Sequence, residues 1–262
     1  MSQGALPAYY TRLAEFRSLF SMGTPILTYH KLGPRPPRVR RKGLYVSAAL
    51  LDRQLEELRR AGFASGSLDA VPGALGGAGR SVVVTFDDGC ANVLEHGLGP
   101  LERYEFRAVQ FLVAGLLGKT NAWDADRGEA PEPLMNVSQV RTWLAAGHSV
   151  GAHSMTHPDL TRVPPARARE EIGASKKRLE DLFGVPVAHF CYPYGAWNPA
   201  LAEMVREAGY RTACTTEFGV NTAGTPPLAL RRITARYRSR SLRSILRSVL
   251  GARTYLWVTA VK

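Results

Sequence analysis

In VVVTFDDGC, residues 82–90, a run of mostly β-branched side chains ends directly at two adjacent aspartates. Four to eight apolar residues bounded by a turn signal are typical of a strand buried on both faces, as in a parallel sheet. Asp87 and Asp88 would then stand where the strand leaves the core. Aspartate and glycine also favour turns, so this segment alone fits a simple turn at least as well as a pair of functional carboxylates.

Short β-type runs alternate with longer amphipathic runs along the rest of the chain, which predicts βα units around a parallel sheet. The strands are predicted at residues 25–30, 81–86, 108–113, 148–153, 187–192, 211–215 and 230–235. Helices are predicted after Ser47, Ser138 and Asn198, because each can cap a helix N-terminus, and over residues 165–183. In the helix at residues 165–183, Glu171 and Lys176 are predicted to lie on a solvent-facing side.

The length of 262 residues and the 45% share of hydrophobic residues are compatible with one α/β barrel domain. We expect a helical extension over residues 1–23 and a single domain over 24–262. Residues 241–262 are expected to form a C-terminal helix and tail packed on that domain. The apolar faces of both terminal segments fit packing on the barrel, and they also fit a peripheral contact with the inner membrane surface.

The formal net charge of +12 is compatible with nucleic acid, an anionic substrate or a membrane surface. The densest basic run, GPRPPRVRRKG at residues 33–43, is broken by prolines and lies in no nucleic-acid-binding module. We therefore predict no nucleic-acid partner.

Three widely spaced cysteines, Cys90, Cys191 and Cys214, cannot form a closed disulfide framework and suggest a reducing compartment. The first residues show no secretory leader pattern. The sequence therefore predicts a cytoplasmic location.

Polar residues follow several predicted strands, and the working groups of parallel βα architectures gather at the carboxyl ends of strands. His153 and His157 can converge on one ion if a helical turn follows their strand. Two histidines and one carboxylate leave coordination positions open for water, as in a hydrolytic or redox site, and the neighbouring aspartate can take a proton. The long loop at residues 118–136 is expected to be a binding loop.

Three motifs, TFDDG, HSMTH and YPYG, occur in this order, each after a predicted strand. With them the chain resembles the NodB-homology polysaccharide deacetylases, carbohydrate esterase family 4. The resemblance implies an α/β fold of the irregular (β/α)7-type barrel kind. It also implies a metal-dependent hydrolase that removes N-acetyl groups from amino sugars by attack of a metal-bound water.

Carried over by position, the resemblance implies that Asp87 is the catalytic base and that Asp88, His153 and His157 bind the metal. It implies that the backbone N–H of Tyr194 contributes to the oxyanion hole. The cofactor is then one divalent ion; zinc suits the ligands, and cobalt, nickel, iron or manganese are alternatives. Tyr192, Tyr194 and Trp197 can offer flat faces to a sugar, or they can pack in the core at a strand end.

The chain departs from the family pattern in two places. Cys191 stands where many members have an arginine that pairs with the base, and we expect Arg232, rather than Arg231, to take over this role. No Leu-x-His motif follows residue 235. The segment PILTYH, residues 25–30, resembles the circularly permuted poly-N-acetylglucosamine deacetylase branch, which implies that His30 is the acid.

A fourth family motif is not identifiable, and Glu217 and Asp124 are candidate supporting carboxylates. The expected substrate is an N-acetylated glycan or a lipid-linked sugar precursor. Two alternatives remain open at this point: a hydrolase of a small non-sugar amide, and a glycan-binding protein with a decayed site.

Overall fold

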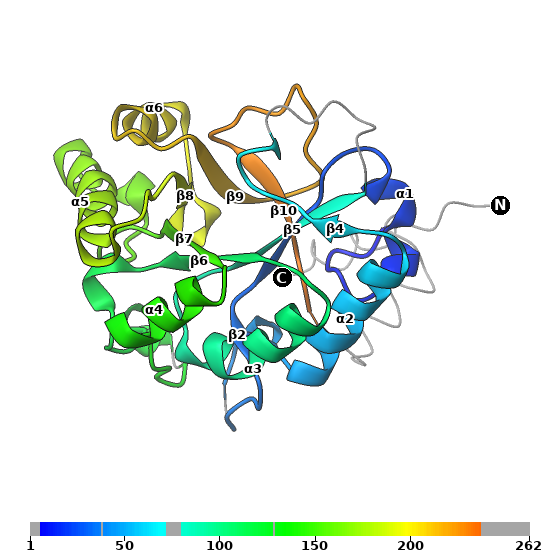
Figure 1. Ribbon diagram of the computed structural model, residues 1–262. Coiled ribbons are helices and arrows are strands. Elements are labelled where there is room, and N and C mark those ends of the chain that lie inside the picture. Colours follow the sequence, from blue (N-terminus) through cyan, green and yellow to red (C-terminus); the bar gives the residue numbers. More distant parts are fainter. Residues whose placement is uncertain (1–5, 38, 72–79, 128, 237–262) are drawn as a thin grey trace, which may run out of the picture.

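Seven parallel strands close into a barrel in the structure, a computed structural model that describes residues 6–37, 39–71, 80–127 and 129–236 (Figure 1). The barrel order is β1-β10-β9-β8-β7-β6-β5, and β5 returns to β1. These strands are β1 Ile26–Tyr29, β5 Ser81–Phe86, β6 Ala108–Leu112, β7 Ser149–Ala152, β8 His189–Cys191, β9 Thr212–Phe218 and β10 Leu230–Thr234. The predicted α/β barrel is confirmed.

Each predicted strand is present, and most ends differ from the prediction by one to three residues. Three two-residue strands were not predicted: β2 Lys31–Leu32, β3 Tyr45–Val46 and β4 Ala64–Ser65. β1 closes the barrel, since Thr28 pairs with Thr85 of β5 on one side and with Thr234 of β10 on the other.

Helices surround the barrel (Figure 1). They are α1 Arg17–Phe20, α2 Ala48–Arg60, α3 Ala91–Arg103, α4 Val137–Ala145, α5 Pro165–Phe183 and α6 Pro199–Glu207. Short 3-10 helices cover Leu13–Glu15, Lys42–Leu44, Ala114–Leu116, Ala122–Arg127, Leu160–Arg162 and Pro193–Gly195.

The helix caps confirm two predictions and correct a third. The side chains of Ser47 and Asn198 accept hydrogen bonds from the third residue of α2 and of α6. The prediction that Ser138 caps α4 is wrong. Asn136 caps this helix, because its side chain accepts from the Gln139 N–H while the Gln139 side chain accepts from the Asn136 N–H.

The described part of the N-terminal segment packs on the barrel. Tyr10 forms a bridge with Ala235 just after β10, and the rings of Tyr10, Phe16 and Phe20 contact one another. The predicted helix and tail at residues 241–262 lie outside the described residues. None of the helices in the described ranges has the length and apolar character needed to cross a membrane.

Candidate active site

A cavity of about 320 Å³ opens at the carboxyl ends of the barrel strands. Its walls combine residues that follow six of the seven barrel strands, in keeping with the alignment of strand ends in a parallel barrel. The lining residues are His30, Arg41, Leu44, Asp87, Asp88, Trp123, Asp124, His153, His157, Tyr192, Tyr194, Gly195, Thr216, Thr234 and Arg236. The prediction that the polar strand ends meet in one place is therefore confirmed.

Asp88, His153 and His157 form a buried cluster whose ligand atoms lie within 4.8 Å of one another. Oδ1 of Asp88 lies 3.6 Å from Nε2 of His153 and 3.4 Å from Nε2 of His157. Burial raises the pKa of Asp88, but the two imidazoles outweigh burial and hold that pKa well below its ordinary value. Asp88 is therefore an ionised acceptor between two imidazole nitrogens.

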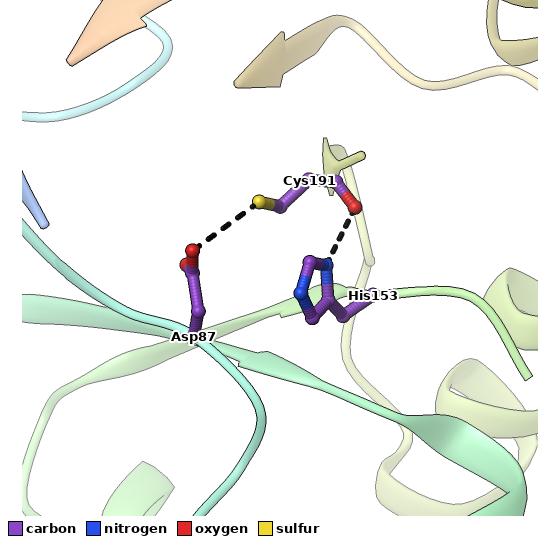
Figure 2. Close-up of side chains that lie close together, drawn as sticks. All are labelled: Asp87, His153 and Cys191. Carbon is purple, nitrogen blue, oxygen red and sulfur yellow. Dashed lines mark hydrogen bonds between the residues drawn. The ribbon is translucent and has the colours of Figure 1, made fainter. Parts of the chain in front are cut away.

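The protonation of His153 follows from one contact. Its Nδ1 lies 2.7 Å from the backbone oxygen of Cys191, as Figure 2 shows, and a carbonyl oxygen can only accept. Nδ1 therefore carries the hydrogen and donates it. Nε2, which lies toward Asp88, is then the ring nitrogen that can bind a metal ion once its own hydrogen is lost.

The backbone around the site adopts uncommon conformations. Among the described non-glycine residues, five have positive φ, and four of them lie in or beside the cavity: Asp88, Ser154, His157 and Tyr194. Such conformations cost about 1–3 kcal/mol each and concentrate at functional sites. His153 and His157 thus converge through a bend with positive φ at Ser154 and His157, and the helical turn considered from their spacing is not formed.

Glu171 of α5 holds this bend in place. The prediction that Glu171 faces solvent is therefore wrong. Its buried carboxylate accepts hydrogen bonds from the backbone N–H groups of Met155 and Thr156 at 2.9 and 2.8 Å. The hydroxyl of Thr156 donates to it as well. Lys176 is not free in solvent either, since its ammonium donates to Glu180 and to the Val187 carbonyl oxygen.

The donor set of Asp88, His153 and His157 suits a divalent cation, because two imidazole nitrogens and one carboxylate leave further positions open. Nδ1 of His157 is buried and has no hydrogen-bond partner among the described residues. A second group, Asp87, His153 and Cys191, is equally compact. It is a poorer cation site, since both oxygens of Asp87 already accept from a guanidinium.

That guanidinium belongs to Arg232. It donates from Nη1 and Nη2 to the two oxygens of Asp87 at 2.8 and 2.7 Å, and it is 2% exposed. Nε donates to the backbone oxygen of Thr215, in a stretch where the register between β9 and β10 shifts. Burial raises the pKa of Asp87, but Arg232 outweighs burial and keeps that pKa below its ordinary value.

Arg231, the alternative partner considered from the sequence, faces outward. Neighbouring residues of a strand point to opposite sides, so only one of the two arginines can reach the barrel interior. Arg231 is exposed, and its backbone N–H donates to Asn221. The structure therefore places Arg232 on Asp87.

Cys191 occupies the space beside this pair. Its thiol lies 3.7 Å from Asp87, as Figure 2 shows, and 3.1 Å from Nη2 of Arg232. The small thiol leaves room for the guanidinium that arrives from β10. Arg232 on β10 thus supplies the positive charge that Cys191 on β8 does not provide.

His30 follows β1 and is partly exposed to the cavity. Its Nε2 lies 3.8 Å from Oδ2 of Asp87. Burial lowers the pKa of His30, and the opposing effects of Asp87 and Asp88 only partly offset it. The imidazole is therefore held neutral next to the carboxylate.

The aromatic residues predicted to contact a sugar separate into three environments. Tyr192 is buried, and its hydroxyl donates to the Leu228 carbonyl oxygen, so it forms the wall of the cavity. The ring of Tyr194 contacts His157 edge to face at 4.7 Å. Trp197 donates to Glu217 and is not among the lining residues.

Sequence reasoning missed Trp123, which stacks on His157 with ring centroids 4.3 Å apart. This residue and Asp124 come from the loop at residues 118–136 and line the cavity, as a binding loop would. Arg41, Thr216, Thr234 and Arg236 were also missed. Nothing in their sequence context distinguishes them from other surface residues, and only closure of the barrel brings them together.

The parallel barrel with an aspartate–histidine cluster at its strand ends defines a class of barrel proteins with hydrolase-like sites. Within that class, the sequence profile described as polysaccharide deacetylase matches residues 76–213. The match covers more than half of the chain, so the chain belongs to the polysaccharide deacetylase family.

Known proteins are similar over part of their length. The chain is 29% identical over 135 residues to the chitooligosaccharide deacetylase of a Bradyrhizobium species, covering 50% of this chain and 53% of that protein. It is 24% identical over 141 residues to the poly-beta-1,6-N-acetyl-D-glucosamine N-deacetylase of Staphylococcus aureus, covering 53% and 48%. The chain thus spans about half the length of these relatives.

The fold is also similar to a solved structure, that of Streptococcus pyogenes deacetylase PplD in complex with acetate. The TM-score is 0.71 at 23% identity, over 86% of this chain and 97% of that chain. At this identity the similarity supports the barrel fold.

Proposed function

We propose that this protein is a metal-dependent hydrolase that removes N-acetyl groups from an amino-sugar glycan or a glycan precursor. The observation that carries the proposal is the pairing of two unlike aspartates in one cavity. Asp88 lies between two imidazoles, whereas Asp87 is ion-paired with Arg232 and lies beside His30. Membership of the polysaccharide deacetylase family supports the reaction class.

Asp88, His153 and His157 would hold the divalent ion, and zinc suits this donor set. When bound, such an ion polarises an amide carbonyl and makes a water molecule easier to deprotonate. Trp123 on one face of His157 and Tyr194 on its edge would keep this ligand in place.

Asp87 would act as the general base that takes the proton from the attacking water. A base must be ionised before the reaction, and Arg232 secures this by keeping the pKa of Asp87 below its ordinary value despite burial. The two-point contact also fixes the orientation of the carboxylate, with Oδ2 on the side of His30.

His30 would return the proton to the leaving amine. Its Nε2 is 3.8 Å from Oδ2 of Asp87, so a small movement lets the proton pass from the carboxylic acid to the imidazole. The lowered pKa of His30 then makes the imidazolium a ready donor. The backbone N–H of Tyr194 remains our proposal for the oxyanion contact, at a position held in positive φ.

The named activities of relatives, on chitooligosaccharide and on poly-N-acetylglucosamine, support an N-acetylated amino sugar as substrate. Of the substrates expected from the sequence, a lipid-linked precursor used on the cytoplasmic side of a membrane stays part of the proposal.

The experiment starts from protein stripped with a chelator and reloaded separately with zinc, cobalt, nickel, manganese or ferrous iron. Acetate release is measured from β-1,4- and β-1,6-linked N-acetylglucosamine oligomers and from small acyl amides. We expect release from sugars only with metal. Release from small amides alone would favour the amide hydrolase, and metal binding without any hydrolysis would favour a glycan-binding protein.

A further inference from the structure

Two arginines, Arg41 and Arg236, line the same cavity as the aspartates and histidines, although they are far apart in the sequence. Neither contacts Asp87 or Asp88 through a hydrogen bond or ion pair described in the structure. The hydrolysis of a neutral acetamide, as proposed above, uses neither of these two arginines. Their presence therefore calls for a feature of the substrate other than its acetamido group.

Arg236 is held in a defined position. Its guanidinium lies 3.8 Å from the ring centroid of Tyr9, and its backbone N–H donates to Tyr10. It lies close to the backbone of Gly43, since a Cβ there would lie 2.7 Å from Nε of Arg236 and would require the guanidinium to shift. Nε is buried and has no hydrogen-bond partner within the described ranges.

Arg41 is fixed through its backbone, whose N–H donates to Oε1 of the buried Glu129 at 2.8 Å. Its side chain is exposed, and no ion pair joins it to an acidic side chain in the described part of the chain. A cation next to the cavity without an acidic partner is available to an anion that enters.

The charge of the site supports the same conclusion. Asp87, Asp88 and Asp124 line the cavity, and Arg232 lies directly behind Asp87. These three aspartates balance the three arginines 41, 232 and 236. A bound divalent cation therefore leaves a surplus of positive charge in a small, partly enclosed space, which favours an anionic substrate over a neutral one.

We propose that the substrate is an N-acetylated amino sugar that carries a phosphate ester, and that Arg41 and Arg236 bind the phosphate. This inference rests on the proposed function. Guanidinium groups suit phosphate because they offer paired donors in a plane. The cavity of about 320 Å³ is near the lower end for small-molecule sites, so the phosphate must lie within about one sugar ring of the acetamido group. A phosphate on carbon 1, beside the acetamido group on carbon 2, meets this condition.

The test compares four substrates that share one sugar: methyl N-acetylglucosaminide, N-acetylglucosamine 1-phosphate, its nucleoside diphosphate derivative, and its lipid-linked diphosphate in detergent micelles. The metal-loaded protein should show a kcat/KM about tenfold to a hundredfold higher for the phosphorylated sugars than for the neutral one. The two diphosphates distinguish a soluble nucleotide sugar from a lipid-linked one.

The variants Arg41→Gln and Arg236→Gln should each lower kcat/KM for the phosphorylated sugars much more than kcat/KM for the methyl glycoside, and so remove most of this preference. Arg40→Gln is the matched control: it removes an exposed arginine next to Arg41 that does not line this cavity. Gly43→Ala should resemble Arg236→Gln, because the added methyl displaces the guanidinium.

Equal kcat/KM for the neutral and phosphorylated sugars would overturn this inference and leave the proposed function intact. If none of the four is hydrolysed, the proposed function fails for these sugars, and calorimetric titration of the same compounds still decides the inference. Tighter binding of the phosphates that depends on Arg41 and Arg236 supports it. Equal binding, or a preference that both variants retain, contradicts it.

Discussion

The carboxylate of Asp87 is bounded by a guanidinium, a thiol and an imidazole, each from a different strand end. Arg232, from β10, supplies the positive charge that the family resemblance led us to expect at the position of Cys191. It is buried and contacts the carboxylate at two points. A carboxylate buried to this degree needs such a partner to remain ionised.

Removing this partner should raise the pH at which the enzyme becomes active. In Arg232→Met, the guanidinium no longer opposes the effect of burial, so the pKa of Asp87 rises and the base stays protonated to higher pH. The acidic limb of the pH profile of kcat/KM should therefore move to higher pH, with activity partly recovered in alkaline buffer.

Arg232→Lys keeps the positive charge without the paired contact and should shift the acidic limb less. This second variant keeps the prediction testable if Arg232→Met does not fold. The exposed Arg231→Ala serves as the control, with an unchanged profile. An acidic limb that stays in place in both Arg232 variants would show that this arginine does not set the ionisation of Asp87.

Glu171 offers a second test on a single side chain. Its carboxylate holds the bend between His153 and His157 through two backbone N–H groups and one hydroxyl. Glu171→Gln replaces one acceptor oxygen with a donor, so the bend should loosen and metal affinity should fall about 10- to 100-fold.

Competition with a chromogenic chelator measures this affinity directly. The neighbouring Glu170→Gln removes the same charge from an exposed position of α5 and should leave affinity unchanged. Equal affinities for wild type and Glu171→Gln would mean that the bend does not depend on this carboxylate.

Among the elements, strands were easier to predict than the connections between them. The run at residues 81–86 is mostly β-branched and carries no charge, and β5 spans the same residues. The bend after β7 has no comparable sequence pattern. Ser154 and His157 adopt positive φ there, and the bend is held by hydrogen bonds to Glu171, which is distant in the sequence. A cap depends on a single side chain, and the predicted cap, Ser138, lies two residues from Asn136, which caps the helix in the structure.

Substitutions at the start of α4 test which of these two residues caps the helix. Asn136→Ala removes the reciprocal hydrogen bonds with Gln139 and should lower the free energy of unfolding by about 1 kcal/mol. Ser138→Ala should change it little, since Ser138 lies exposed within the first turn. Denaturant titration of both variants gives the answer, and a larger loss for Ser138→Ala would restore the sequence-based assignment.

For the molecule as a whole, the chain's first strand and the segment before it complete the barrel. β1 joins β5 to β10, and the Tyr10 bridge to Ala235 follows directly on this seam. The described residues before β1 therefore pack on the barrel, and the division of the chain at residues 1–23 stays a prediction.

Truncation of an aromatic side chain in this segment measures its contribution. Phe16 is fully buried between the rings of Tyr10 and Phe20, so Phe16→Ala should lower the free energy of unfolding by about 3–5 kcal/mol. Leu6→Ala, at a side chain that is 45% exposed, is the control and should cost far less. Similar small losses in both would indicate a segment that does not contribute to the core.

Some parts of the fold and the candidate site could be predicted from the sequence, and others could not. The barrel and the groups Asp87, Asp88, His153, His157, His30 and Arg232 were predictable because motifs and strand ends mark them. Trp123, Arg41 and Arg236 were not, since they come from loops whose paths depend on the closed barrel. Glu171 was assigned to solvent because a carboxylate on an amphipathic helix gives no sign of the backbone groups beneath it.

The division of labour between the two aspartates is the central claim, and metal content measured together with turnover tests it most directly. Asp87→Asn should retain the divalent ion at the wild-type stoichiometry and lose about 100-fold or more in deacetylation rate. Asp88→Asn should lose the ion itself, because one of the three ligands loses its charge. Loss of metal to the same degree in both variants, or full turnover in Asp87→Asn, would contradict the assignment of Asp88 to the ion and Asp87 to the proton.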